Sequence, residues 1–274
     1  MANSTSLIRS IVYLGIICLP LSCSRMEEAE REKLRKLNCK AEPIYRSQSD
    51  CFYSMVSPGS SVRSLYPWEA EANLPRLTKE YFRCKGNPAN LPLEMENGPL
   101  FDCNSRHGLP VINGKEGVYP ILLDLLNYIQ RKTGKRVVVT CGHRCPVHNA
   151  YSDPARENRV SKHQIGAEVD FYVQGMEERP QEIAGLLMQY FQESSQYKND
   201  KEYLEFKHAA APSCSQSWMN KEILIFVQQK GERRDWDNRH PFAYLTLQVR
   251  YDRELKEAVV YQWAKANLGY PRGY

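Results

Sequence analysis

A histidine and an aspartate lie seven residues apart in the segment SKHQIGAEVD, where His163 and Asp170 flank a turn residue, Gly166. Asp170 has an apolar neighbour on each side, and burying a carboxylate in such surroundings is costly unless a cation or strong donors compensate it. An imidazole and a carboxylate that converge after a turn are suitable ligands for zinc. The alternative reading of the same spacing is a core histidine and a hydrogen-bonded strand aspartate.

This segment resembles the Ser-x-His-x-x-Gly-x-Ala-x-Asp motif of zinc D-alanyl-D-alanine carboxypeptidases and their endopeptidase relatives, which share a fold with the hedgehog signalling domain. Ser161, His163, Gly166 and Asp170 match the motif, whereas Glu168 replaces the family's small alanine. An additional carboxylate is therefore expected on the strand face that carries Asp170.

A second segment, GHRCPVHNA at residues 142–150, resembles the family's Gly-Tyr-Arg-Ser-Pro-x-x-Asn-Ala block, with His143 for tyrosine and Cys145 for serine. The matched arginine of the family meets a peptide carboxylate or carbonyl, so the resemblance implies that Arg144 binds substrate, a role that suits the guanidinium fork. Ser161 would steady the substrate or the ligand loop. The alternatives are an arginine paired with a nearby acid and a turn-capping hydroxyl.

The family has a third zinc ligand, a histidine late in the chain on or beside a strand, and many members have a catalytic carboxylate three residues before it. DWDNRHPF, at residues 235–242, contains Asp237 and His240 at that spacing. The resemblance thus implies zinc bound by His163, Asp170 and His240, with one coordination position left for water and Asp237 as general base.

Other assignments of the third ligand and the base remain open in the sequence. Asp235 and Glu168 are alternative bases, and a strand position near Gln248 corresponds to the ligand in other family members but would ligate zinc poorly. The same charged segment is also typical of a solvated loop with turns at Asn238 and Pro241.

The function that the resemblance implies is zinc-dependent cleavage of peptidoglycan stem peptides that contain D-amino acids. Two alternatives from other classes are an inactive zinc-binding or cell-wall-binding module of the same fold, and a disulfide-rich structural lipoprotein. The net charge of +5 comes from cations scattered beside acids, so no nucleic-acid partner is expected.

The N-terminus has the pattern of an export signal. Arg9 precedes an apolar run at residues 11–21, which is too short to span a bilayer stably. The run ends in LPLSC, so we expect a signal peptide over residues 1–22 and a bacterial lipoprotein anchor at Cys23. The protein would then be exported, periplasmic or held at a membrane only by this signal or lipid; the alternatives are cleavage without lipidation and an uncleaved anchor.

Nine cysteines are present, and two of them lie in this leader, which leaves seven. Such a number in an exported chain predicts up to three disulfides and one free thiol. Cys141 and Cys145 would form a structural disulfide together or with Cys214, although a redox pair or a second metal site with His143 and His148 also fits the residue types.

Hydrophobic periodicity divides the chain into a charged tether helix at residues 24–38, a loop-rich cysteine-containing extension at 39–118 and a zinc peptidase-like domain at 119–274. The expected class is α+β, with a small, mainly antiparallel sheet and flanking helices. Helices are predicted at 119–133 and 180–194, strands at 136–140, 168–173, 223–229 and 243–251, and a returning hairpin strand at 257–263.

Overall fold

The computed structural model describes residues 74–155, 160–209, 216–232 and 235–272, which belong to one compact unit, Val56–Tyr274. The predicted signal peptide, Cys23, the tether helix and residues 39–73 of the extension lie outside the described residues, as do Cys39, Cys51 and Cys214. In the part that is described, no helix combines the length and apolar character needed to cross a membrane.

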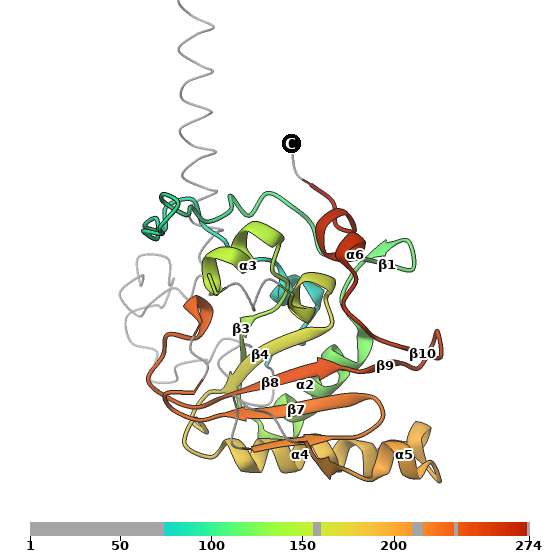
Figure 1. Ribbon diagram of the computed structural model, residues 1–274. Coiled ribbons are helices and arrows are strands. Elements are labelled where there is room, and N and C mark those ends of the chain that lie inside the picture. Colours follow the sequence, from blue (N-terminus) through green and yellow to red (C-terminus); the bar gives the residue numbers. More distant parts are fainter. Residues whose placement is uncertain (1–73, 156–159, 210–215, 233–234, 273–274) are drawn as a thin grey trace, which may run out of the picture. The chain divides into compact units, whose positions relative to one another are not determined.

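A six-stranded antiparallel sheet forms the centre of the fold. Its strands lie in the order β3-β4-β8-β7-β6-β5, and Figure 1 shows the first four of them in succession. They are β3 (Val137–Cys141), β4 (Glu168–Val173), β5 (Lys207–His208), β6 (Gln216–Met219), β7 (Ile223–Gln228) and β8 (Tyr244–Val249). The predicted α+β class with a small antiparallel sheet is confirmed.

Two long helices match the periodic segments of the sequence. They are α2 (Pro120–Thr133) and α4 (Pro180–Glu193), and each begins with proline in its first turn, where the missing N–H costs no hydrogen bond. Gly134, with φ of 62°, ends α2 in the left-handed conformation that favours glycine. Shorter helices are α3 (Pro146–Ser152), α5 (Lys201–Leu204), α6 (Trp263–Leu268), η3 (Lys79–Phe82), η5 (Lys162–Ile165), η6 (Ser195–Tyr197) and η7 (Trp236–Asn238).

The core lies between one face of the sheet and helices α2 and α4. Val169, Phe171 and Val173 of β4 are buried there, as are the alternate residues of β7 and β8. Because successive strand residues point to opposite faces, Glu168 and Asp170 project from the other face. Helices α2 and α4 therefore cover one face of the sheet, and the candidate site residues Glu168 and Asp170 lie on the opposite face.

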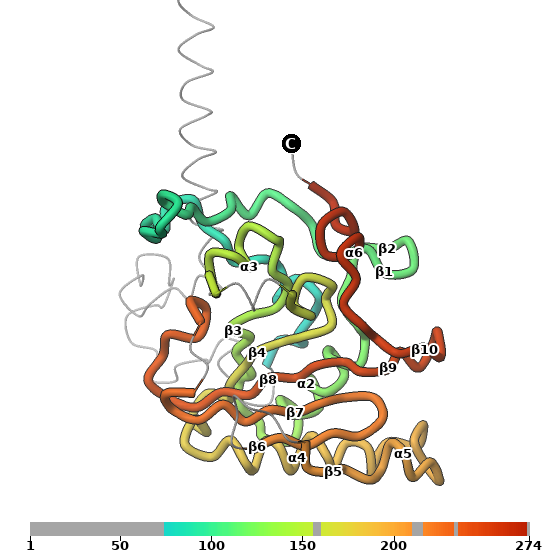
Figure 2. Tube along the Cα trace, viewed as in Figure 1, coloured from blue at the N-terminus to red at the C-terminus, as the bar shows by residue number. Residues whose placement is uncertain are grey.

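The segment before α2 packs into the same core, because Leu77, Phe82 and Leu109 are buried in it. A short hairpin, β1 (Val111–Ile112) and β2 (Lys115–Glu116), then lies beside α6, as Figure 2 shows. The predicted return strand is shorter than expected: β10 (Glu257–Ala258) pairs with β9 (Tyr251–Asp252), and the chain then turns into α6.

Candidate metal centre

A short helical turn places His163 next to strand β4. The Ser161 hydroxyl accepts a hydrogen bond from the His163 backbone N–H at 3.2 Å, and Gln164 completes a capping box. Gly166, with φ of 70°, then reverses the chain into β4. The turn expected at Gly166 is present, and the Ser161 side chain caps η5, which is the alternative role that the sequence left open.

The imidazole of His163 is oriented by a backbone carbonyl. Its Nδ1 lies 2.7 Å from the carbonyl oxygen of Gly142, which can only accept a hydrogen bond. Its Nε2 lies 3.4 Å from Asp170 Oδ2 and 3.8 Å from Glu168 Oε1. Histidines that bind metals usually donate one ring N–H to such a carbonyl, which leaves the other nitrogen for the ion.

Asp170 is held on its strand by neighbours on both sides. Its Oδ1 accepts a hydrogen bond from Thr246 of β8 at 2.6 Å, and its Oδ2 accepts one from Asn238 of η7 at 2.9 Å. Thr246 is the direct cross-strand partner of Asp170, so a hydroxyl and not an imidazole occupies the β8 position opposite the aspartate. These donors satisfy the buried carboxylate without removing its charge.

Strand β3 contributes a third potential ligand. A β-bulge between Val139 and Cys141 makes Cys141 the cross-strand partner of Asp170, so its side chain lies on the face of the aspartate. The Cys141 Sγ is 3.4 Å from His163 Nδ1, and the potential ligand atoms of Cys141, His163 and Asp170 all lie within 4.8 Å of one another. This buried group could hold a metal ion.

His240, the third ligand implied by the resemblance, is placed elsewhere. Its ring stacks on Phe242 at 4.1 Å between centroids, and it contacts the rings of Tyr172 and Tyr244. Among the described residues, the group of potential ligands around His163 and Asp170 contains Cys141 and not His240. The structure thus brings two of the three expected ligands together and supplies a cysteine as a third.

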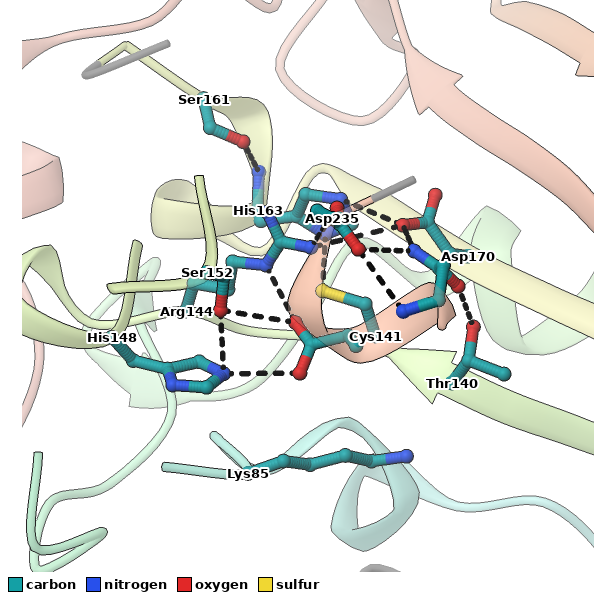
Figure 3. A network of polar contacts seen from close by, with 12 residues as sticks. Lys85, Thr140, Cys141, Arg144, His148, Ser152, Ser161, His163, Asp170 and Asp235 are labelled. Atoms are coloured by element: carbon teal, nitrogen blue, oxygen red, sulfur yellow. Dashed lines mark hydrogen bonds and ion pairs between the residues drawn. The ribbon is translucent and has the colours of Figure 1, made fainter. Parts of the chain in front are cut away.

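Arg144 lies within a network of buried acids and does not face an open site. Its Nε donates to Asp237 at 2.9 Å, its Nη2 donates to Asp235, and Nη2 lies 4.0 Å from Asp170 (Figure 3). Asp237 in turn is 3.1 Å from His148 Nε2. The expected substrate-binding arginine and the expected base are therefore paired with each other.

The pKa values of the two aspartates that Arg144 contacts are shifted in opposite directions. Burial raises the pKa of Asp237, but Arg144 and His148 lower it more, so the net pKa lies well below its usual value. The pKa of Asp235 lies above its usual value, chiefly because of burial; the negative charges of Asp170 and Asp237 raise it further, and Arg144 lowers it only in part. Asp237 is accordingly a poor proton acceptor near neutral pH.

The network has a formal excess of negative charge. Five carboxylates, from Asp102, Glu168, Asp170, Asp235 and Asp237, surround Arg144, His148 and His163. With both imidazoles protonated, five minus three leaves two negative charges, and two lysines face these acids, Lys85 near Asp237 and Lys162 near Glu168. Buried carboxylates need such cations or strong donors beside them.

Two features of the site are not evident from the sequence motifs. Cys141 lies one residue before the matched GHRCPVHNA block, and Asn238 lies between the two residues chosen as base and ligand. Asn238 is fully buried and links Asp170 to Thr140, whose hydroxyl donates to the Asn238 side-chain oxygen at 2.7 Å. A cysteine directly after the predicted strand at 136–140 is the one signal that could have indicated this third potential ligand.

Comparison with known proteins gives no relative: no family model, no curated protein and no solved structure matches this chain.

Proposed function

We propose that this chain is a zinc-dependent peptidase that cleaves D-amino-acid-containing stem peptides of peptidoglycan, in an α+β domain of the D-alanyl-D-alanine carboxypeptidase type. The observation that carries the proposal is the orientation of His163, whose Nδ1 meets the Gly142 carbonyl while Nε2 faces Asp170 at 3.4 Å. The predicted export signal agrees with a substrate in the cell wall.

The donor atoms fit zinc. Imidazole nitrogen, carboxylate oxygen and thiolate sulfur are its usual ligands, and a catalytic site uses three of them. Burial raises the pKa of Cys141 to about 12, so this group is a thiol unless a coordinated cation deprotonates it. We therefore assign His163 through Nε2, Asp170 and Cys141 as the zinc ligands, in place of the set with His240. The Cys141 sulfur, which lies 3.4 Å from His163 Nδ1, would have to turn toward the ion at Nε2. Bound there, zinc would act as a Lewis acid and lower the pKa of water.

Glu168 is the general base that the geometry favours over Asp237. Its Oε1 lies 3.8 Å from His163 Nε2 and accepts a hydrogen bond from Gln248 at 2.8 Å, which holds the carboxylate in place. Asp237 is instead engaged by Arg144 and His148. The residue that departs from the family motif thus supplies a proton acceptor beside the metal ligands.

Arg144 has a positioning role in this proposal. Its guanidinium holds Asp235 and Asp237 and approaches Asp170 at 4.0 Å, so it fixes the acids around the centre. A substrate carboxylate would have to displace these internal partners, and we do not assign substrate binding to Arg144.

The test is to incubate the zinc-loaded full chain with muropeptides and to follow released D-alanine and shortened stems by mass spectrometry. Glu168→Gln should retain zinc and lose about 10²–10⁴-fold in rate, the usual contribution of a general base. The matched variant Asp237→Asn should retain most of the chemistry. Cys141→Ser and His163→Ala should lose the zinc ion of this centre, whereas His240→Ala should keep it.

One specific observation favours a second candidate, a zinc-binding module without hydrolysis. The ligand side chains of His163 and Asp170 are each 4% exposed, and Arg144 is equally buried and paired internally. Zinc that is lost with His163→Ala, together with no cleavage of any muropeptide, would favour this module. A chain that binds no zinc at His163 would reject both candidates.

A further inference from the structure

We infer that Cys84, Cys103, His107 and Cys145 form a second zinc site, separate from the candidate centre at His163 and independent of any peptidase activity. The potential ligand atoms of these four residues all lie within 4.8 Å of one another. Three thiols and one imidazole are a common ligand set of closed, structural zinc sites. The four residues come from two segments that lie far apart in the sequence, 84–107 and the start of α3.

The separations of the ligand atoms fit a tetrahedral ion. Zinc–sulfur bonds of about 2.3 Å and zinc–nitrogen bonds of about 2.05 Å at tetrahedral angles place two sulfurs about 3.8 Å apart and a sulfur and a nitrogen about 3.6 Å apart. Cys84 Sγ lies 3.8 Å from Cys103 Sγ, and Cys103 Sγ lies 3.6 Å from His107 Nε2. A disulfide would instead need the sulfurs at about 2.05 Å.

Each sulfur also has the backbone donor that thiolate ligands usually receive. Cys84 Sγ accepts from the Cys145 N–H at 3.5 Å, Cys103 Sγ from the Ser105 N–H at 3.4 Å, and Cys145 Sγ from the His148 N–H at 3.3 Å. Such N–H groups stabilise the negative charge of metal-bound sulfur.

The imidazole of His107 is oriented for the same purpose. Its Nδ1 lies 3.4 Å from the carbonyl oxygen of Gly108, and its Nε2 is directed toward the sulfurs. A carbonyl on one ring nitrogen and sulfurs on the other is the arrangement expected of a ligating histidine.

The surroundings close the site. Cys84, Cys103 and Cys145 are buried and Tyr270 packs against them. A Cβ on Gly86 would lie 2.0 Å from Cys103 Sγ, so the backbone passes directly over the sulfurs and only glycine fits there. This enclosure leaves no position for a substrate, which indicates a structural and not a catalytic ion.

The ion would join parts of the chain that regular structure does not. Residues 84–107 contain no helix or sheet strand of their own, and His107 bridges to Arg272 near the other end of the described chain. Cys145 caps α3 and directly follows Arg144. Zinc at this site would fix the loop segment to the helix that borders the candidate catalytic centre, as metals do in small domains with little core.

The alternative occupant of this cluster is a disulfide, because the sequence predicts export. Among themselves, these three cysteines can form only one disulfide, which would leave the third thiol and His107 outside it. All four cysteines of the described residues are free in the structure.

The test uses the full chain carrying His163→Ala and Asp170→Ala, so that the other candidate centre cannot contribute. We expect one tightly bound zinc per chain by elemental analysis and its loss with Cys145→Ser or His107→Ala. Cys141→Ser, which changes a buried cysteine outside the cluster, is the matched control and should leave the zinc content unchanged.

X-ray absorption at the zinc edge gives a measurement that does not depend on the folding of variants. In the unsubstituted chain, a sulfur-rich first shell would support the site. Absence of zinc–sulfur scattering beyond that of one cysteine would overturn it, as would zinc content that ignores Cys145→Ser. Peptide mapping that finds two of Cys84, Cys103 and Cys145 joined in protein isolated without reductant would overturn it equally.

Discussion

Replacing Arg144 with methionine should be among the most destabilising single changes in this fold. The Arg144 side chain is 4% exposed and holds Asp237 at 2.9 Å, Asp235, and Asp170 at 4.0 Å. Methionine fills similar volume but leaves the three carboxylates without their shared cation. Removing one partner of a buried ion pair costs about 3–5 kcal/mol, a large part of the total stability of about 5–15 kcal/mol of a typical protein.

A matched control is Arg179→Met, which removes an exposed ion pair with Glu182 at 3.3 Å. Both side chains of that pair are more than half exposed, so the expected loss is about 0–1 kcal/mol. The measurement is urea unfolding of the wild type and the two variants at pH 7, compared through the free energy of unfolding. Equal losses in the free energy of unfolding for Arg144→Met and Arg179→Met would refute this reasoning.

The difference should also depend on pH with a definite sign. The pKa of Asp237 is lowered in the folded protein, chiefly because Arg144 and His148 outweigh the effect of burial. Its contribution is therefore fully present above the unfolded value of about 3.9 and is lost as the pH falls below it. The gap between wild type and Arg144→Met should accordingly narrow in acid, and a gap that widens would contradict the assigned pairing.

Three further outcomes follow from the same geometry. Burial lowers the pKa of His148, but Asp102 and Asp237 raise it more, to about 10. The stabilisation that the protonated imidazole provides is therefore complete below about pH 6.5 and disappears toward pH 10. The Tm of His148→Gln should accordingly fall less than that of the wild type over this pH range. Gly142→Ala should lower both Tm and zinc affinity, because the new Cβ would lie 2.5 Å from the Phe82 Cα and displace the carbonyl that orients His163. The control is Gly185→Ala in α4, where a new Cβ would have nothing within 4 Å and the change should be neutral or stabilising. Chelation of zinc should lower Tm by several degrees, since about 1 kcal/mol corresponds to about 2–4 °C in a domain of this size, and a Tm that does not respond to chelator would count against both metal sites.

The long periodic elements could be predicted from the sequence to within a residue or two. β4 has the predicted bounds, α4 begins at the predicted residue Pro180, and α2 begins one residue after its predicted start at 119. Strands β5 and β6 were not predicted, because KH and QSWM carry no apolar alternation of their own. β6 pairs with the strongly apolar β7, and β5 pairs with β6 at the edge of the sheet, and this information is not local.

The site followed the same division between local and distant information. His163 and Asp170 meet because seven residues with a turn at Gly166 bring them together. Cys141 joins them through the register of β3 against β4, which a single sequence does not specify. The position of the loop that carries His240 is fixed by Asp235 and Asp237, which pair with Arg144. The sequence predicted neither of these two ion pairs, because Arg144 is about 90 residues away.

The proposed zinc cluster at Cys84 depends still more on distant contacts. Only Cys103 and His107 are close in sequence, four residues apart, and the other ligands are separated from them by 18 or more residues. The sequence instead predicts disulfides for these cysteines, because the cysteine count and the predicted export signal indicate an oxidising compartment. Only the arrangement of the sulfurs in space separates the two interpretations.

The bulge in β3 makes the length of that strand as important as its composition. The extra residue at Thr140 lets two consecutive side chains serve one face, with Thr140 bonded to Asn238 and Cys141 beside His163. Deleting Thr140 would restore regular alternation after Val139 and keep Cys141 opposite Asp170, but it would remove the hydroxyl that holds Asn238. A one-residue gap at this point in a homologous chain would therefore indicate that the support of Asn238 is lost while the cysteine stays beside His163.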